Sequence, residues 1–415
     1  MPTAPTNLPA DDLGHAPSDV RYPARRIASH GTPGTGPLTI FVGGIHGNEP
    51  MGVRAIEEVF AELQASTRPF TGRAVALLGN RAAFARGDRL IDRDMNRVFR
   101  YDLDREPTEE PPVAAPRLDP ADDSAEVRER DALLDAIREE VASSDPDAEV
   151  IVIDLHTFSG AGPPFCVLSD TLRNRGFAEA WPIPRILGLP EELPGTAIEY
   201  LTAAGLIALV VETGRHDDPV SAELHAAVIR LALGQAGHLP GGGLGDPGAD
   251  QQRLADAVRG LPRQLDVQYR HPVEPDDGFV MDPGWSTFDV VRRGEPVATS
   301  KGNAIPAPRR GRMLLPLYQS QGSDGFFLAR PIGAFWLLLS TALRRAGLTG
   351  VAKLLPGVRR HPTRPHTLEV DRRVARWLAV DVFHLLGYRA LGGDEDTLWV
   401  ARRQHDLRRP RTMRP

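Results

Sequence analysis

The chain has 415 residues, a net charge of −6 at pH 7 and 41% hydrophobic residues. This length predicts two or three folding units with a core large enough to hold a buried site. The negative charge argues against nucleic acid as a partner. The single cysteine, Cys166, excludes an intrachain disulfide framework and a cysteine-rich metal site. No apolar run is long enough for a membrane span, and residues 1–30 lack the apolar segment of a signal peptide. We therefore expect a cytoplasmic protein with no membrane partner.

After a flexible N-terminus at residues 1–34, apolar runs alternate with amphipathic segments over residues 35–240. The expected strands lie at 37–45, 74–80, 149–156, 163–170 and 206–213. The expected helices lie at about 52–65, 123–142 and 217–234, the second opening on a capping box of Asp123 and Glu126. Because the strands are apolar on both faces, the pattern predicts an α/β domain with a central mixed, largely parallel sheet flanked by helices.

The composition changes after residue 240. A glycine-rich start predicts a linker over 241–262. Short segments separated by Gly and Pro predict a small all-β domain at 263–332. The helical pattern of residues 333–415 predicts a helical C-terminal extension. Within the first domain, the acidic, proline-rich segment 101–122 predicts a surface loop or lid.

A candidate metal site follows the first buried strand, in the segment GGIHGNEP. Open α/β sheets bind ligands at the carboxyl ends of their strands. His46 and Glu49 are three residues apart, so both side chains can face one metal ion, and His156 ends another buried strand. Two histidines and one glutamate with an open fourth position are typical of a catalytic zinc site. Asp154 could orient one of the ligands.

Two further motifs could complete a site. The segment IDRDMNRVF contains Asn96 and Arg97, which suit a grip on a carboxylate because a guanidinium binds it through two hydrogen bonds. A salt-bridged surface turn is the alternative. Glu212 follows the apolar run LIALVV, where partial burial would raise its pKa toward that of a general base. A helix-capping or salt-bridged carboxylate is the alternative.

Together these motifs resemble the succinylglutamate desuccinylase/aspartoacylase family, a branch of the zinc carboxypeptidase-like amidohydrolases. HGNE, GNRAA, DRDMNR, DLH and VETG occur in the order seen in the family, over about residues 35–235. The β-rich segment up to about residue 332 is also similar to the C-terminal domain of the family. The resemblance implies a zinc carboxypeptidase-like fold and one Zn²⁺ per subunit.

The resemblance also implies roles for individual residues. The implied zinc ligands are His46, Glu49 and His156. Arg81 would polarise the scissile carbonyl, and Glu212 would be the base that activates water. Asn96 and Arg97 would hold the free carboxylate of the substrate.

The chain departs from aspartoacylase-type members just before Glu212. Those members carry an arginine there that binds the second carboxylate of the substrate, whereas residues 196–211 contain Glu199 as their only charge. The corresponding pocket is therefore expected to be apolar or to take a neutral or basic group.

The expected function is zinc-dependent deacylation of an N-acyl amino acid or a related small amide that bears a carboxylate. A carboxypeptidase-like peptidase or an esterase is an alternative. An inactive zinc-binding or scaffolding protein is an alternative of another class. The expected partner is a small molecule with a free carboxylate, and a homodimer is an open alternative. The C-terminal extension could cover the site, mediate dimerisation or bind a partner.

Overall fold

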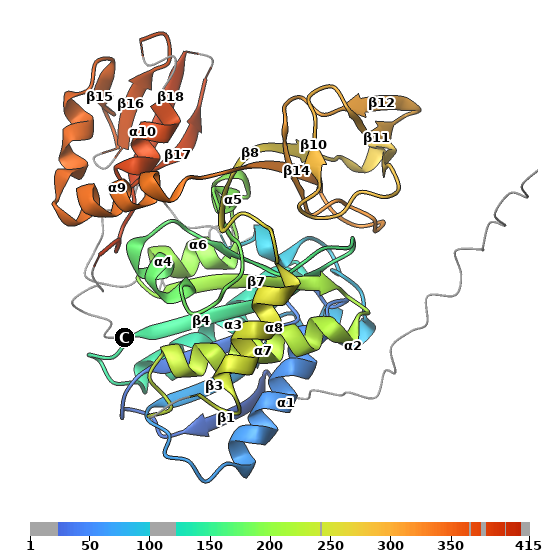
Figure 1. Ribbon diagram of the computed structural model, residues 1–415, viewed down its shortest axis with the longest axis vertical. Coiled ribbons are helices and arrows are strands. Elements are labelled where there is room, and N and C mark those ends of the chain that lie inside the picture. The colour runs from blue at the N-terminus through green and yellow to red at the C-terminus, as the bar shows by residue number, and fades with distance from the viewer. Residues whose placement is uncertain are drawn as a thin grey trace, which may run out of the picture.

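The computed structural model describes residues 24–99, 122–240, 243–364, 367–374, 379–394 and 396–407. Its main feature is an 11-stranded mixed sheet (Figure 1). In spatial order the strands are β1 (Arg26–Gly31), β3 (Arg73–Leu78), β2 (Leu38–Gly43), β4 (Val150–Phe158), β7 (Ile207–Arg215), β5 (Phe165–Leu168), β6 (Arg185–Leu187), β8 (Gln264–Pro272), β14 (Asp324–Pro331), β13 (Gly311–Leu314) and β10 (Val290–Val291). The four strands β3, β2, β4 and β7 are parallel to one another.

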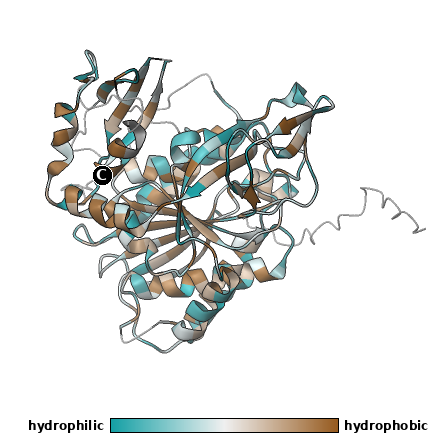
Figure 2. Ribbon diagram, turned by 45° about the horizontal axis from the view of Figure 1, so that its top comes forward, coloured by the Kyte–Doolittle hydropathy of each residue, from teal (hydrophilic) through white to brown (hydrophobic). Residues whose placement is uncertain are grey.

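Helices cover both faces of this sheet because successive strand residues point to opposite faces and both sets are apolar. In β2, Ile40 and Val42 pack into one core, whereas Phe41 packs into the other. The core around Phe41 is covered by α1 (Met51–Ala65), α7 (Pro219–Gln235) and α8 (Pro247–Ala257). The other core is covered by α3 (Ala125–Ala142), α5 (Leu189–Glu192) and α6 (Ala197–Ala203). Figure 2 shows the hydrophobic strands at the centre. The predicted fold class is confirmed.

The segment predicted as a small β domain contributes to two sheets. Its strands β8, β14, β13 and β10 continue the main sheet. Three others form a separate antiparallel sheet, namely β9 (Phe279–Met281), β11 (Pro296–Ser300) and β12 (Asn303–Pro306).

The prediction of a linker over 241–262 is wrong where α8 forms. The Asp246 side chain accepts hydrogen bonds from the N–H groups of Gly248 and Ala249, and Pro247 occupies the first turn. An aspartate cap followed by proline is a strong helix start. Leu254 then anchors the helix in the core.

The C-terminal extension was predicted to be helical, and this is wrong for about half of its elements. Its helices are α9 (Ala334–Arg345), η4 (Leu348–Leu354) and α10 (Ala379–Leu385). Its strands form an antiparallel sheet in the order β15 (Val358–Arg360), β16 (Thr367–Asp371), β18 (Thr397–Arg402) and β17 (Tyr388–Gly393). Leu368 and Val370 are buried on one side of β16, as the alternation in TLEVD allows.

The flexible N-terminus predicted at 1–34 is wrong for residues 26–31, which form β1 and pair antiparallel with β3. Residues 1–23 lie outside the described residues. So does the predicted lid at 101–122, except for Asp122. None of the described helices is long and apolar enough to cross a bilayer.

Candidate metal centre

His46 and Glu49 lie in the turn between β2 and α1, at the carboxyl end of the parallel strands. The turn closes through the N–H of Glu49, which donates to the carbonyl of His46 at 3.2 Å. It also packs tightly against α2 (Arg81–Arg86). A Cβ at Gly47 would lie 2.2 Å from the carbonyl carbon of Ala83. Only glycine therefore allows this close approach.

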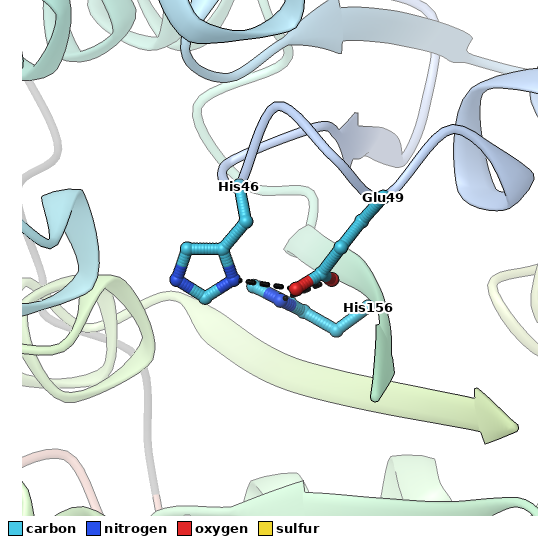
Figure 3. Close-up of side chains that lie close together, drawn as sticks. All are labelled: His46, Glu49 and His156. Atoms are coloured by element: carbon cyan, nitrogen blue, oxygen red, sulfur yellow. Dashed lines mark hydrogen bonds and ion pairs between the residues drawn. The ribbon is translucent and has the colours of Figure 1, made fainter. Parts of the chain in front are cut away.

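The three predicted ligands converge on one point (Figure 3). Glu49 Oε1 lies 2.7 Å from His46 Nδ1, and Glu49 Oε2 lies 3.1 Å from His156 Nδ1. The candidate ligand atoms lie within 4.8 Å of one another, and all three residues are buried. Within the described ranges, no other group of three His, Cys, Asp or Glu residues is arranged to hold a metal ion.

Each imidazole faces a second carboxylate with its other nitrogen. Asp154 Oδ2 lies 2.8 Å from His156 Nε2, and Asp94 Oδ1 lies 3.2 Å from His46 Nε2. Metal-binding histidines commonly have such an outer partner, which fixes the ring orientation. Asp154 was predicted for this role. Asp94 was missed, although it lies within the DRDMNR motif.

The electrostatics of the cluster hold the carboxylate ligand in its charged form. Burial alone would raise the pKa of Glu49, but the imidazoles of His46 and His156 outweigh burial and hold this pKa well below its ordinary value. A charged carboxylate and two imidazole nitrogens are a donor set that suits a divalent cation of intermediate softness.

Glu212 lies beside the metal ligands because of strand register. His156 on β4 and Glu212 on β7 are aligned partners on adjacent parallel strands. Burial raises the pKa of Glu212 to about 8, and the carboxylates of Glu49 and Asp154 act in the same direction. Its Oε2 atom is buried and has no hydrogen-bond partner among the described residues.

The ligands and Glu212 open onto a cavity of about 130 Å³. Its polar end includes His46, Glu49, Arg89, Asn96, Arg97, His156, Glu212 and Asp324, and its apolar walls include Phe158, Val167, Leu189, Leu193, Ile198, Val210, Leu315 and Phe327. The structure thus brings six of the seven predicted site residues together.

Asn96 and Arg97, which were predicted to bind the substrate carboxylate, already form hydrogen bonds with other groups of the protein. Arg97 Nη2 donates to Asp324 Oδ2 at 2.5 Å, and Arg270 Nε donates to Asp324 Oδ1 at 2.5 Å. Asn96 Oδ1 accepts from the N–H of Ala197 at 2.8 Å. Asp324 was not predicted from sequence. It therefore offsets part of the positive charge that a substrate carboxylate would meet at Arg97.

Arg81 is not among the cavity-lining residues, and the role expected for it does not fit its place. It opens α2 directly after the cap residue Asn80, and its N–H donates to Glu129 on α3 at 3.3 Å. Arg89 lines the cavity instead. Its guanidinium lies 3.3 Å from Glu49 Oε1 and 3.2 Å from Asp94 Oδ2.

Glu126 holds the turn that carries Arg89 and Asp94. The expected capping box is absent, because Ser124 is the N-cap of α3 and makes no side-chain cap bond. Glu126 is fully buried. Its carboxylate accepts from the N–H groups of Ile91, Asp92 and Arg93 at 2.7, 3.1 and 3.1 Å.

The fold and this cluster define an α/β protein with a candidate metal centre at the carboxyl end of its central sheet. Residues 35–232 match the family model of the succinylglutamate desuccinylase/aspartoacylase catalytic domain. These residues are just under half of the chain, and through them the chain is similar to that family.

Known proteins share this similarity both in sequence and in fold. A succinylglutamate desuccinylase of Pseudomonas aeruginosa is 39% identical over 56 residues, which are 14% of this chain and only 17% of that relative. A solved succinylglutamate desuccinylase/aspartoacylase of Rhodobacter sphaeroides is 19% identical, with a TM-score of 0.51 over 74% of this chain and 88% of that one. The ectoine utilization protein EutE of Ruegeria pomeroyi is also 19% identical, with a TM-score of 0.51 over 72% and 86%. The structural likeness shows a shared fold.

Proposed function

We propose that this chain is a zinc-dependent hydrolase that deacylates an N-acyl amino acid or a related small amide bearing a carboxylate. The observation that carries the proposal is the convergence of His46, Glu49 and His156 beside Glu212 in one cavity. The family match over residues 35–232 and the desuccinylase names of the relatives support amide hydrolysis.

The donor set supports zinc as the metal. Both histidines present Nδ1 toward the Glu49 carboxylate and face an outer carboxylate with Nε2. Zinc bound there would polarise the amide carbonyl and lower the pKa of a water molecule to about 7.

The reaction then depends on groups of the chain itself. Glu212 takes a proton from the attacking water and returns it to the leaving nitrogen, and burial raises its pKa toward the range that a group acting as both base and acid needs. Arg89 takes the role first expected of Arg81, because its guanidinium lies at the cavity and can donate to the developing oxyanion. Asn96 and Arg97 orient the substrate through its carboxylate.

Two observations weigh against the alternatives. A cavity of about 130 Å³ favours a small substrate over a peptide. Glu212 lines the same cavity, and no described protein group donates a hydrogen bond to its Oε2 atom. A scaffolding protein gains nothing from such a group, whereas a general base needs it free.

The test is a hydrolysis screen of N-acyl amino acids with zinc-loaded protein and with Glu212→Gln. We expect the wild type to hydrolyse at least one of them, and the variant to bind zinc while its kcat falls by ~10²–10⁴-fold. The matched control is Glu223→Gln, an exposed glutamate on α7 that pairs with Arg253, which should change neither quantity. Undiminished turnover by Glu212→Gln, or no turnover by any zinc-loaded protein, would refute the proposal.

A further inference from the structure

One wall of the cavity is built from the segment that contains α5 and α6. This segment contributes Leu189, Pro190, Leu193, Thr196 and Ile198 to the cavity lining. Leu189, Leu193 and Ile198 are buried in the core below it. The wall therefore presents a mainly apolar surface to whatever occupies the cavity.

The inner edge of this wall is hydrogen-bonded to the turn that carries Asn96 and Arg97. The N–H of Ala197 donates to Asn96 Oδ1 at 2.8 Å, and the N–H of Phe99 donates to the carbonyl of Gly195 at 3.0 Å. Gly195 has a φ of +86°, and a Cβ there would lie 2.4 Å from the carbonyl oxygen of Arg97. The wall thus lies next to the end of the substrate that bears the carboxylate.

The outer side of the wall is held by the C-terminal extension, through Glu191 on α5. Its Oε2 accepts from the N–H of Ala390 on β17 at 2.9 Å and lies 3.0 Å from His384 Nε2 on α10. Its Oε1 is ion-paired with Arg403, directly after β18. The Glu191 side chain is only 10% exposed, so these bonds are shielded from solvent. Two elements of the extension, α10 and β17, and the residue after β18 therefore meet on this one carboxylate.

A second bond of the same kind holds α6. Glu199 Oε1 lies 2.7 Å from Arg389 Nη1 on β17, and the two side chains are 15% and 13% exposed. Glu199 is the only charged residue within 196–211. The only charged side chain of this segment therefore pairs with the extension and does not face the cavity. Figure 1 shows the extension on the side of α5 and α6.

The extension itself is anchored to the catalytic domain by Arg344 of α9, whose side chain is fully buried. Arg344 Nη2 donates to Asp170 Oδ2, after β5, and to the carbonyl of His384, both at 2.8 Å. Buried ion pairs add little net stability, but their removal leaves an unpaired charge, so they restrict how two elements can dock.

We propose that the C-terminal extension is a positioning element for substrate selection. It fixes the α5–α6 wall through Glu191 and Glu199, and the wall receives an apolar side chain of the acylated amino acid. The choice of substrate in this inference rests on the proposed function. The contacts between the extension and the wall do not depend on it. The apolar lining of the wall, rather than the cavity volume of about 130 Å³, supports the choice of an apolar side chain, because the same volume must also hold the amide and the carboxylate of the substrate.

The experiment compares zinc-loaded wild type with three variants of the full chain. Arg389→Met removes the ion pair with Glu199, and Arg389→Lys keeps its charge. The matched control, Arg373→Met, removes an exposed ion pair with Asp371 on the same extension. For each protein, kcat and KM are measured with N-acetyl-leucine, N-acetylglycine and N-acetylaspartate. Hydrogen exchange is measured over residues 189–203 and over β4.

We expect the wild type to prefer N-acetyl-leucine to the other two substrates by ~10-fold or more in kcat/KM. Arg389→Met should lose most of this preference through a higher KM, with kcat for N-acetylglycine unchanged, because uniform binding is lost. Its amides at 189–203 should exchange ~10-fold faster while those of β4 do not change. Arg389→Lys should recover most of the preference, and Arg373→Met should match the wild type.

Each contrary result overturns a separate part of this proposal. A wild-type preference for N-acetylaspartate contradicts the apolar side chain. Faster exchange with unchanged preference contradicts the role in selection. Unchanged exchange in Arg389→Met contradicts the bracing of the wall. Absence of hydrolysis of any substrate by zinc-loaded wild type instead refutes the proposed function, and the exchange data still decide the bracing.

Discussion

Asp154 Oδ2 lies 2.8 Å from Nε2 of His156, two residues further along β4. Residues i and i+2 of a strand point to the same face, so the strand itself presents both a metal ligand and the carboxylate that orients it. Both residues are almost fully buried. The orientation of the His156 ring is therefore set by local backbone geometry at the end of β4.

Replacing Asp154 with Asn should weaken metal binding without abolishing it. The amide cannot offer the same negative charge to His156 Nε2, and outer partners of metal ligands are typically worth ~10–100-fold in affinity. Competition with a zinc chelator measures the dissociation constant. Asp147→Asn, an exposed aspartate before β4, is the control and should leave it unchanged. Equal affinities of Asp154→Asn and the wild type would show that the carboxylate does not tune the site.

Glu126→Gln should destabilise the protein and disturb the site together. A glutamine cannot accept all of the hydrogen bonds from Ile91, Asp92 and Arg93, and its NH₂ group would face N–H donors. Each unsatisfied buried donor costs about 1–3 kcal/mol, so we expect a loss of about 2–4 kcal/mol in the free energy of unfolding. Urea denaturation measures it, with the exposed Glu139→Gln as control. A loss below about 0.5 kcal/mol would contradict this role.

Asp324→Asn should change charge selection in the cavity. It removes the carboxylate that Arg97 and Arg270 share, so the positive charge facing the substrate rises. We expect KM for N-acetylaspartate to fall by ~10-fold, because a hydrogen bond between charged groups is worth about 1.5–3 kcal/mol. Steady-state kinetics measure it, with the exposed Asp276→Asn as control. An unchanged or higher KM would mean that Asp324 does not set the preference.

The docking of the extension should weaken as the pH rises. Burial alone would lower the pKa of His384, but the Glu191 carboxylate outweighs burial and the opposing charge of Arg403 and raises this pKa. Asp266 acts in the same direction as Glu191. Because the folded pKa lies above the unfolded value of about 6.5, the stabilisation is complete below about pH 6.5 and is lost as the pH rises through the folded pKa.

His384→Gln should therefore remove one component of the decline in stability above about pH 6.5. That component amounts to no more than about 1.4 kcal/mol per pH unit. Urea unfolding at several values between pH 6 and pH 9 measures it in both proteins. Identical pH profiles for the wild type and His384→Gln would show that this histidine does not couple docking to pH.

The sequence predicted the parts of this protein that depend on local pattern. The runs around Phe41 and Leu155 carry apolar residues on both faces, which is the pattern of a strand between two helix layers. The ends of such strands fall at one edge of the sheet, so His46 and His156 could be placed together from their positions alone. The family motifs added the order of these segments along the chain.

The predictions that were wrong or missing concern residues whose positions depend on the tertiary structure. Arg81 and Arg89 lie in the same short segment, and only the direction of the chain after Asn80 decides which of them reaches the cavity. Asp324 comes from a strand far along the chain, and no local pattern links it to Arg97. The strands of the extension were missed because short alternating runs such as that at Leu368 are interrupted by helical segments.

The most direct test of the account is a zinc titration of metal-depleted protein, with amide hydrolysis measured at each step on the best substrate of the screen. The account predicts that activity is absent without metal, rises in proportion to added zinc and saturates at one zinc per chain. It also predicts that His46→Ala neither binds zinc with this stoichiometry nor gains activity. Full activity of the metal-depleted protein, or saturation with zinc and no hydrolysis, would contradict the account.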